Sequence, residues 1–181
     1  ITIIINGTNF IDGVNCNAIG YYFLITIVLF KLDLFKENSF DLILIKNWIA
    51  VLFVVYILNF FNKLFLGDNG SYFLGFIYSY LLINLYLQNQ YLSPFFIILL
   101  LWYPAFENLF SIIRKKNINF SPLKPDAKHL HHLIYIFFKK KIKLKKISSN
   151  SFSGMIITFY NLIIFYIASK YFYHSQILII L

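Results

Sequence analysis

The sequence predicts an all-α protein, a polytopic transmembrane helical bundle, and three observations support this. Of its 181 residues, 60% are hydrophobic and 13% are charged, whereas soluble domains are about 45–50% apolar and about 25% charged. Several apolar stretches reach the roughly 20 residues that a membrane-spanning helix needs. The basic residues, moreover, are concentrated in one segment. We therefore expect residues 1–181 to form a single membrane domain.

The apolar stretches predict the order of the helices. Spans are expected at about 18–34, 43–62, 71–90 and 94–113, and a fifth at about 152–170. The opening "ITIIIN" is predicted to end an earlier helix and the closing "SQILIIL" to begin another, which gives five to six transmembrane helices. The chain does not begin with Met and "ITIIIN" lacks the features of a signal peptide. We therefore expect an N-terminal part of the protein to precede this sequence.

The basic segment, about residues 114–150, predicts the orientation. It holds Arg114 and most of the lysines, and such clusters mark the cytoplasmic side of a membrane. Counting the spans backwards places residues 67–71 on that same side, and two further spans place residues 6–16 there as well. Three unusual segments that lie far apart in the sequence are thus predicted to converge on the cytoplasmic face.

The first of these segments is "NGTNFIDGVNCNA", residues 6–18. Its Asn6, Asn9, Asp12 and Asn15 are spaced by three, which on a helix gives one polar face. Its Asn-Gly and Asp-Gly pairs also predict a turn or a broken helix, and irregular backbone at membrane depth is tolerated where it lines a cavity. An ordinary loop with polar helix caps is the alternative.

The second segment is "FLGDNGSYFLGF", residues 65–76. Asp68 precedes a new apolar helix, where free N–H groups attract anions, although an Asp at this position can simply cap the helix. Five of the chain's seven glycines fall in these two segments. Because glycine permits close backbone approach, their presence favours a ligand pocket.

The third segment, "KPDAKHLHHLIY", contains His129, His131 and His132. An exposed loop of histidines without special function is one interpretation. Imidazole can also bind metal, carry protons or donate to phosphate, and carboxylates at a membrane boundary are usually functional. Asp12 and Asp68 would suit Mg²⁺ held together with substrate phosphates. Arg114 and the histidines would add cationic donors for a diphosphate, as phosphoryl transfer requires.

The motifs "NxxNxxDG", "FxGDxGS" and "PDxxHxHH", in this order, resemble those of the polyprenyl-phosphate sugar-1-phosphate transferases, a family that includes MraY and WecA. The resemblance covers nearly the whole chain. It implies a bacterial inner-membrane enzyme with catalytic loops on the cytoplasmic side, which transfers a sugar 1-phosphate from a UDP-sugar to polyprenyl phosphate and releases UMP. The "HxHH" form resembles the WecA/TagO branch and implies an N-acetylhexosamine-type donor in cell-envelope polysaccharide synthesis.

The resemblance also implies roles for single residues. Asp68 would bind Mg²⁺, with Mn²⁺ as a substitute, and Asp12 and Asp68 would be catalytic. The implied substrate-binding residues are Asn6, Asn9, Asn15, Arg114, His129, His131 and His132. The implied partners are UDP-sugar, polyprenyl phosphate and membrane lipid, with a homodimer as an option and no nucleic acid.

The sequence departs from the family pattern at several points. The family usually has Asp where Asn15 stands and Gly where Cys16 stands, and its WecA/TagO branch often has Asp in place of Glu107. The family's acidic pair in an earlier cytoplasmic loop is not found in these residues, so an inactive fragment is one alternative. A transporter is another, because broken helices with Asp and Asn also bind ions. A transporter requires polar residues within several spans, where the sequence offers chiefly Asn84, Glu107 and Asn161.

Overall fold

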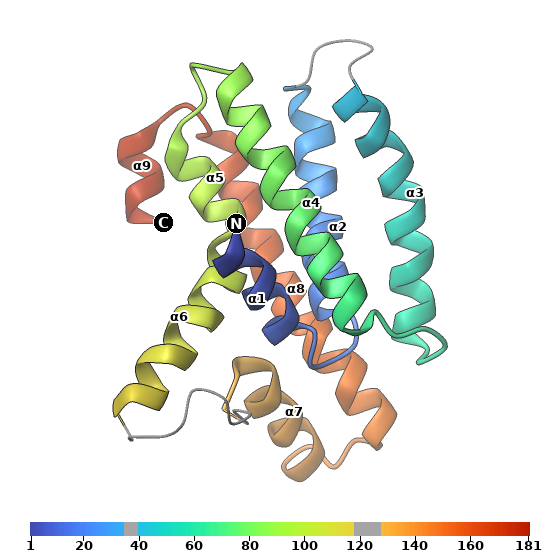
Figure 1. Cartoon of the computed structure of the whole chain (residues 1–181). Coiled ribbons are helices and arrows are strands. Elements are labelled where there is room, and N and C mark those ends of the chain that lie inside the picture. Colours follow the sequence, from blue (N-terminus) through green and yellow to red (C-terminus); the bar gives the residue numbers. More distant parts are fainter. Residues whose placement is uncertain (35–39, 118–127) are drawn as a thin grey trace.

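The computed structural model describes residues 1–34, 40–117 and 128–181. Within these ranges the regular elements are all helices, which confirms the predicted all-α class (Figure 1). In chain order they are α1 (Thr2–Ile11), α2 (Asn17–Leu32), α3 (Phe40–Phe60), α4 (Gly67–Gln88), α5 (Pro94–Leu100), α6 (Trp102–Asn117), α7 (Leu130–Lys140), α8 (Lys146–Lys170) and α9 (Ser175–Ile180).

The lengths of the helices make this a multi-pass membrane protein. Helices α3, α4 and α8 contain 21, 22 and 25 residues, enough at about 1.5 Å per residue to cross a hydrocarbon core of about 30 Å. Helix α2 contains 16 residues and is correspondingly shorter. In the part of the chain that the structure describes, three helices are long and apolar enough to span, or four with the bent pair α5–α6. The sequence had predicted five to six.

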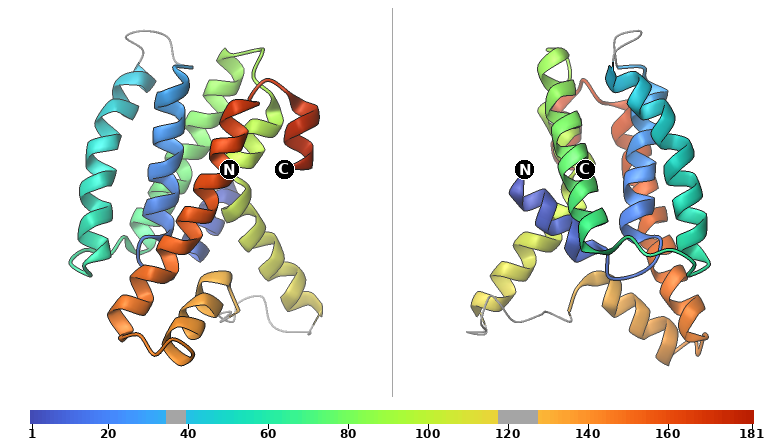
Figure 2. Two further views of the ribbon diagram at one scale, coloured as in Figure 1. Left: turned by 180° about the vertical axis from the view of Figure 1, so that it is seen from behind. Right: turned by 45° about the vertical axis from the view of Figure 1, so that its right-hand side comes forward.

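The predicted span at 94–113 is not one straight helix. It is divided at Leu101 into α5 and α6, which are bent by 70° relative to each other. Pro104 explains the break, because proline lacks a backbone N–H and its ring clashes with the carbonyl four residues earlier. In Figures 1 and 2 the bend turns α6 away from the bundle axis.

Helix α1 packs between α4 and α6 (Figure 2). Two glycines allow this close approach. A Cβ atom added to Gly7 would lie 1.9 Å from the backbone oxygen of Pro104 in α6, and one added to Gly75 of α4 would lie 2.8 Å from Oγ1 of Thr8. Small residues at such crossings are typical of helices packed in membranes. This packing fixes the position of the C-terminal end of α1 in the bundle, and therefore the position of Asp12.

The three segments singled out in the sequence lie at one end of the bundle (Figure 1). The α1–α2 turn, the α3–α4 connection and α7 gather at the lower end in this view, while the α4–α5 connection lies at the upper end. Helix α7 packs on α8, and α8 begins at Lys146, six residues before the predicted start. The predicted basic loop at 114–150 thus contains helical structure. The convergence of the three segments is confirmed, and the assignment of this end to the cytoplasm stays a prediction.

We predict that Gly7→Ala destabilises the protein by about 1–3 kcal/mol, because the new methyl group would collide with backbone that cannot move aside. Thermal unfolding in detergent measures this. Gly70→Ala is the matched control, since its added Cβ would meet only the end of the flexible Leu66 side chain, at 2.7 Å. Equal unfolding temperatures for the two variants would contradict the close packing of α1 on α6.

Candidate active site

The segment around Asp12 is half helix and half turn. Helix α1 ends at Ile11, and the N–H of Asp12 donates to the carbonyl oxygen of Asn9 at 3.2 Å. Residues 12–16 then form a turn before α2 begins at Asn17. The predicted polar face therefore extends from Asn6 to Asp12 only, and Asn15 is not on it. The side chain of Asn6 is exposed.

Asp12 and Asp68 line one cavity of about 290 Å³, although 55 residues separate them in the sequence. Asp12 comes from the α1–α2 turn and Asp68 from the first turn of α4. The Asn9 amide joins the two elements, because its Nδ2 donates to Oδ1 of Asp68 at 2.9 Å and to Oγ of Ser71 at 3.2 Å. Gly67 begins α4 with a φ of 65°, a conformation that favours glycine.

The two carboxylates influence each other. Burial, and secondarily the negative charge of Asp68, raises the pKa of Asp12 to about 7, while a hydrogen bond with the Gly67 backbone opposes the rise. Two carboxylates facing one cavity are what a divalent cation stabilises, and Mg²⁺ commonly takes only one or two from the protein. No cluster of three or more His, Cys, Asp or Glu in the described ranges could hold a metal. A divalent cation between these two carboxylates would take its other ligands from water and phosphate oxygens.

The histidine segment reaches the Asp12 turn from the other side. His129 precedes α7, and the rings of His131 and His132 lie 4.3 Å apart between centroids. His131 lies directly against Gly13, where an added Cβ would come within 2.0 Å of the ring Nε2. Only glycine leaves room for this imidazole beside Asp12. The Asp-Gly pair and the histidine motif are therefore complementary in shape.

The histidines are not exposed. The alternative interpretation, an exposed loop without special function, required them to be. His129 is 5% exposed and His131 is 1% exposed. Burial, helped by the neighbouring His132 and His129, lowers the pKa of His131 to about 3, so its ring is neutral at pH 7. Neither ring nitrogen of His131 bonds to any part of the chain that the structure describes. Because buried polar atoms usually have a partner, these nitrogens are suited to bind water or a ligand.

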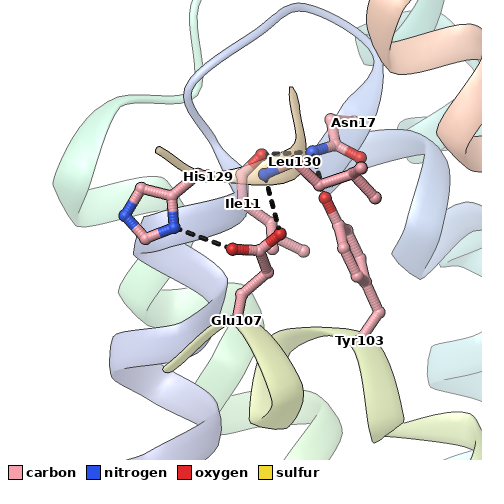
Figure 3. A network of polar contacts seen from close by, with 6 residues as sticks. All are labelled: Ile11, Asn17, Tyr103, Glu107, His129 and Leu130. Carbon is pink, nitrogen blue, oxygen red and sulfur yellow. Dashed lines mark hydrogen bonds and ion pairs between the residues drawn. The ribbon is translucent and has the colours of Figure 1, made fainter. Parts of the chain in front are cut away.

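Helix α6 holds both the Asp12 turn and the histidine segment (Figure 3). Oε2 of Glu107 lies 2.7 Å from Nδ1 of His129, and Oε1 accepts the N–H of Leu130 at 3.1 Å. One turn earlier on α6, the Tyr103 hydroxyl lies 3.3 Å from Nδ2 of Asn17, which also donates to the Ile11 carbonyl at 2.7 Å. Glu107 thus joins helices inside the protein rather than lining a transport path.

Sequence reasoning missed a set of polar residues around the turn, because they belong to no motif and meet only in the folded chain. A second cavity, of about 360 Å³, shares Gly13, Val14 and Asn150 with the first. It is also lined by residues from α7, α8 and the end of α3, namely Asn62, His132, Tyr135, Lys146 and Ile147. The one available signal was the pair of amides Asn59, in the last turn of α3, and Asn62, just after α3, which follow a long apolar stretch.

Arg114 is not among the residues that line either cavity. It lies in the last turn of α6, with its guanidinium 5.1 Å from the centroid of the Phe110 ring. Asp126 of the "PDxxHxHH" motif lies outside the described residues. The structure therefore brings Asp12, Asn15 and Asp68 to one cavity. Asn9 is bonded to Asp68 and His131 lies against Gly13, whereas Arg114 lines neither of the two cavities.

Comparison with known proteins shows what this sequence is similar to. The sequence profile of glycosyl transferase family 4 matches residues 1–86. A probable undecaprenyl-phosphate N-acetylglucosaminyl 1-phosphate transferase of Bacillus subtilis (strain 168) is 36% identical over 141 residues, which cover 74% of this chain and 38% of the relative. The chain is a relative of the polyprenyl-phosphate N-acetylhexosamine-1-phosphate transferases.

Two further transferases with related names are also similar in sequence to this chain. The decaprenyl-phosphate N-acetylglucosaminephosphotransferase of Mycolicibacterium smegmatis (strain ATCC 700084 / mc(2)155) is 31% identical over 152 residues, covering 71% of this chain and 37% of the relative. A Thermotoga maritima undecaprenyl-phosphate α-N-acetylglucosaminyl 1-phosphate transferase is 32% identical over 80 residues, 44% of this chain and 25% of the relative. This chain thus spans less than two fifths of the length of these transferases. No solved structure gives a significant match.

The structure explains how this transferase relative accommodates asparagine at position 15. Nδ2 of Asn15 donates to the backbone oxygen of Asn59 at 2.7 Å and to Oδ1 of Asn62 at 2.8 Å. An aspartate would place an acceptor against the Asn59 carbonyl, so the amide suits this chain better than a carboxylate. Asn15 ties the Asp12 turn to the end of α3, and its amide hydrogens are used within the protein.

Cys16 occupies a position whose backbone favours glycine. Its φ is 67°, its side chain is fully buried, and its N–H donates to Oδ1 of Asn59 at 2.6 Å. A left-handed conformation costs a residue with a Cβ about 1–2 kcal/mol. The glycine usual in the family would avoid that cost.

We predict that Cys16→Gly is more stable than Cys16→Ala by about 1 kcal/mol. Both variants lack the thiol, so the comparison isolates the cost of the left-handed backbone at residue 16. The expected order of stability is the reverse of the usual one, in which alanine is more stable than glycine. Chemical or thermal unfolding in detergent provides the measurement. If alanine is the more stable, residue 16 does not have the φ seen here.

We predict a pH effect from the raised pKa of Asp12. The folded protein favours the protonated acid, so this carboxyl stabilises the fold most at low pH. That contribution is lost as the pH rises from about 4 through about 7, the folded-state pKa. The measurement is the difference in unfolding temperature between the wild type and Asp12→Asn in metal-free buffer. This difference, wild type minus variant, should decrease over this pH range and then stay constant. A difference that does not change with pH would show that the pKa of Asp12 is not raised, and would contradict its burial beside Asp68.

Proposed function

We propose that the protein transfers a sugar 1-phosphate, of the N-acetylhexosamine type, from a UDP-sugar to polyprenyl phosphate and releases UMP. The observation that carries this proposal is the shared cavity of Asp12 and Asp68, which lies beside the histidine cluster at one end of the bundle. The names of the relatives support the lipid acceptor and the N-acetylglucosamine group. Because the chain spans only part of those relatives, the activity is proposed for the whole protein.

The reaction requires one bond to form and one to break at phosphorus. An oxygen of the lipid phosphate attacks the β-phosphorus of the UDP-sugar, a new P–O bond forms, and the bond to UMP breaks. Asp12, with a pKa of about 7, is suited to accept a proton from the lipid phosphate, since a base works best when its pKa lies near the working pH. The histidines face the same region and provide donors for the diphosphate.

Asp68 is the residue placed to hold Mg²⁺, or Mn²⁺ in its stead, with Asp12 across the cavity. Asn9 fixes the orientation of the Asp68 carboxylate through the 2.9 Å hydrogen bond. When bound, the ion would screen the charge of the phosphates and stabilise the displacement. This fit rests on the pair of carboxylates, whose repulsion a cation would relieve.

The site lies at the end of the bundle that carries most of the positive charge. Lysines at the end of α7 and the start of α8 favour the cytoplasmic face of a bacterial inner membrane. There a soluble UDP-sugar and a lipid phosphate in the bilayer can meet. A homodimer remains compatible with this arrangement, and the reaction does not need one.

We predict that Asp68→Asn lowers UMP release from UDP-N-acetylglucosamine by about 100-fold or more, because it removes a charged ligand from the ion that stabilises the transition state. The assay uses the full-length protein in lipid with polyprenyl phosphate. Chelation should abolish wild-type turnover, and added Mg²⁺ should restore it. Asp33→Asn, an exposed carboxylate at the far end of α2, is the control and should keep the wild-type rate. Wild-type turnover in Asp68→Asn would remove the proposed metal role.

A further inference from the structure

We propose that Glu107 is a positioning residue for the reaction: it fixes His129 so that the ring presents Nε2 to the diphosphate of the substrate. This inference rests on the proposed function and assigns a role to a carboxylate that the sequence analysis noted only as a departure from the family pattern and as a polar residue within a span. Neither Glu107 nor His129 is among the residues that line the cavity of Asp12 and Asp68 or the second cavity beside it. Because both oxygens of Glu107 are bonded to the histidine segment, Glu107 acts through His129 and not by contact with the substrate.

The contacts of Glu107 use both of its oxygens. The carboxylate is 3% exposed, with Oε2 bonded to Nδ1 of His129 and Oε1 bonded to the N–H of Leu130 (Figure 3). Leu130 is the first residue of α7, so the negative charge lies at the positive end of that helix, where it is stabilising. A single side chain thus sets both the start of α7 and the rotation of the imidazole.

The hydrogen bond decides which ring nitrogen is available. A carboxylate can only accept, so Nδ1 of His129 must carry the hydrogen and Nε2 is the free position on the far side of the ring. Toward a phosphate oxygen, Nε2 must also carry a hydrogen. The buried Glu107 carboxylate lies behind the ring, where it would strengthen such a hydrogen bond to a phosphate oxygen. The groups that face this ring are Phe10 of α1, Glu107 of α6, and His131 and His132 of its own segment.

The same helix also controls the distance between the histidine and Asp12. Tyr103, one turn before Glu107, bonds to Asn17, which holds the last carbonyl of α1 beside Asp12. Because Tyr103 and Glu107 project from one rigid helix, the Asp12 turn and His129 keep a fixed separation. The 70° bend at Leu101 directs this part of α6 toward the Asp12 turn and His129.

The test compares Glu107→Gln with Glu107→Asp in the full-length protein. Glutamine can still accept from Leu130 N–H, but it places either an amide donor or a neutral oxygen against Nδ1. We expect kcat/KM for the UDP-sugar to fall by about 10–100-fold, the size of effect seen when the carboxylate behind a metal-binding histidine is removed. Glu107→Asp keeps the charge and should restore most of the activity. Asp33→Asn is the matched carboxylate-to-amide control and should behave as wild type.

Two readouts separate positioning from a merely structural role. The ring ¹⁵N resonances of His129, assigned with His129→Asn, should show a protonated Nδ1 in the wild type and a changed pattern in Glu107→Gln. The double variant Glu107→Gln/His129→Asn should be no slower than His129→Asn alone, because the two residues act as a unit.

Additive losses, an unchanged His129 spectrum in Glu107→Gln, or wild-type turnover in Glu107→Gln would each overturn the inference. If Glu107→Gln does not fold, the wild-type protein still tests the inference. A wild-type ¹⁵N spectrum that shows no hydrogen on Nδ1 of His129 would overturn it. A wild-type protein that releases no UMP would instead refute the proposed function, and the ¹⁵N spectra would still decide whether Glu107 fixes the tautomer of His129.

Discussion

The constraint on which the rest of the structure depends is the immobilisation of the short turn between α1 and α2. The turn is held from several sides. Its Gly13 lies against His131, its Asn15 bonds to the end of α3, and a Cβ added to Gly154 of α8 would come within 1.9 Å of the Asn15 carbonyl oxygen. Since α1 is itself packed between α4 and α6, the carboxylate of Asp12 has little freedom to move away from Asp68.

Lipid as the solvent explains why the polar groups gather at one end. Within the hydrocarbon region each backbone group must be satisfied inside its own helix, which leaves little opportunity to build a polar site there. At the end of the bundle the helices stop, and their free N–H and carbonyl groups are available to side chains. Asn9, Asn17 and Glu107 all bond at or near such helix ends. The candidate site is therefore built from the same groups that terminate the helices.

Much of this arrangement could be predicted from the sequence, and the reason is physical. The length of a span is set by the bilayer, so counting apolar stretches placed residues 6–16, 67–71 and the histidines at one end without knowledge of any contact. The 70° bend was signalled only by Pro104, which lies in the middle of the predicted span at 94–113; a proline there can kink a helix or break it, and the sequence does not fix the angle. The burial of the histidines and the roles of Asn59 and Asn150 could not be predicted, because they depend on long-range packing that leaves no periodic pattern. Arg114 was expected at the site because of its charge and because the family resemblance implied it, and neither determines the direction in which α6 leaves the bundle.

The most direct test of the account is the position of Mn²⁺ in crystals of the full-length protein, located by its anomalous scattering. Metal bound between the carboxylates of Asp12 and Asp68, beside Gly13 and His131, is the predicted result. An ion bound elsewhere, or carboxylates that face different cavities, would contradict the claim that the α1–α2 turn and the start of α4 form one site.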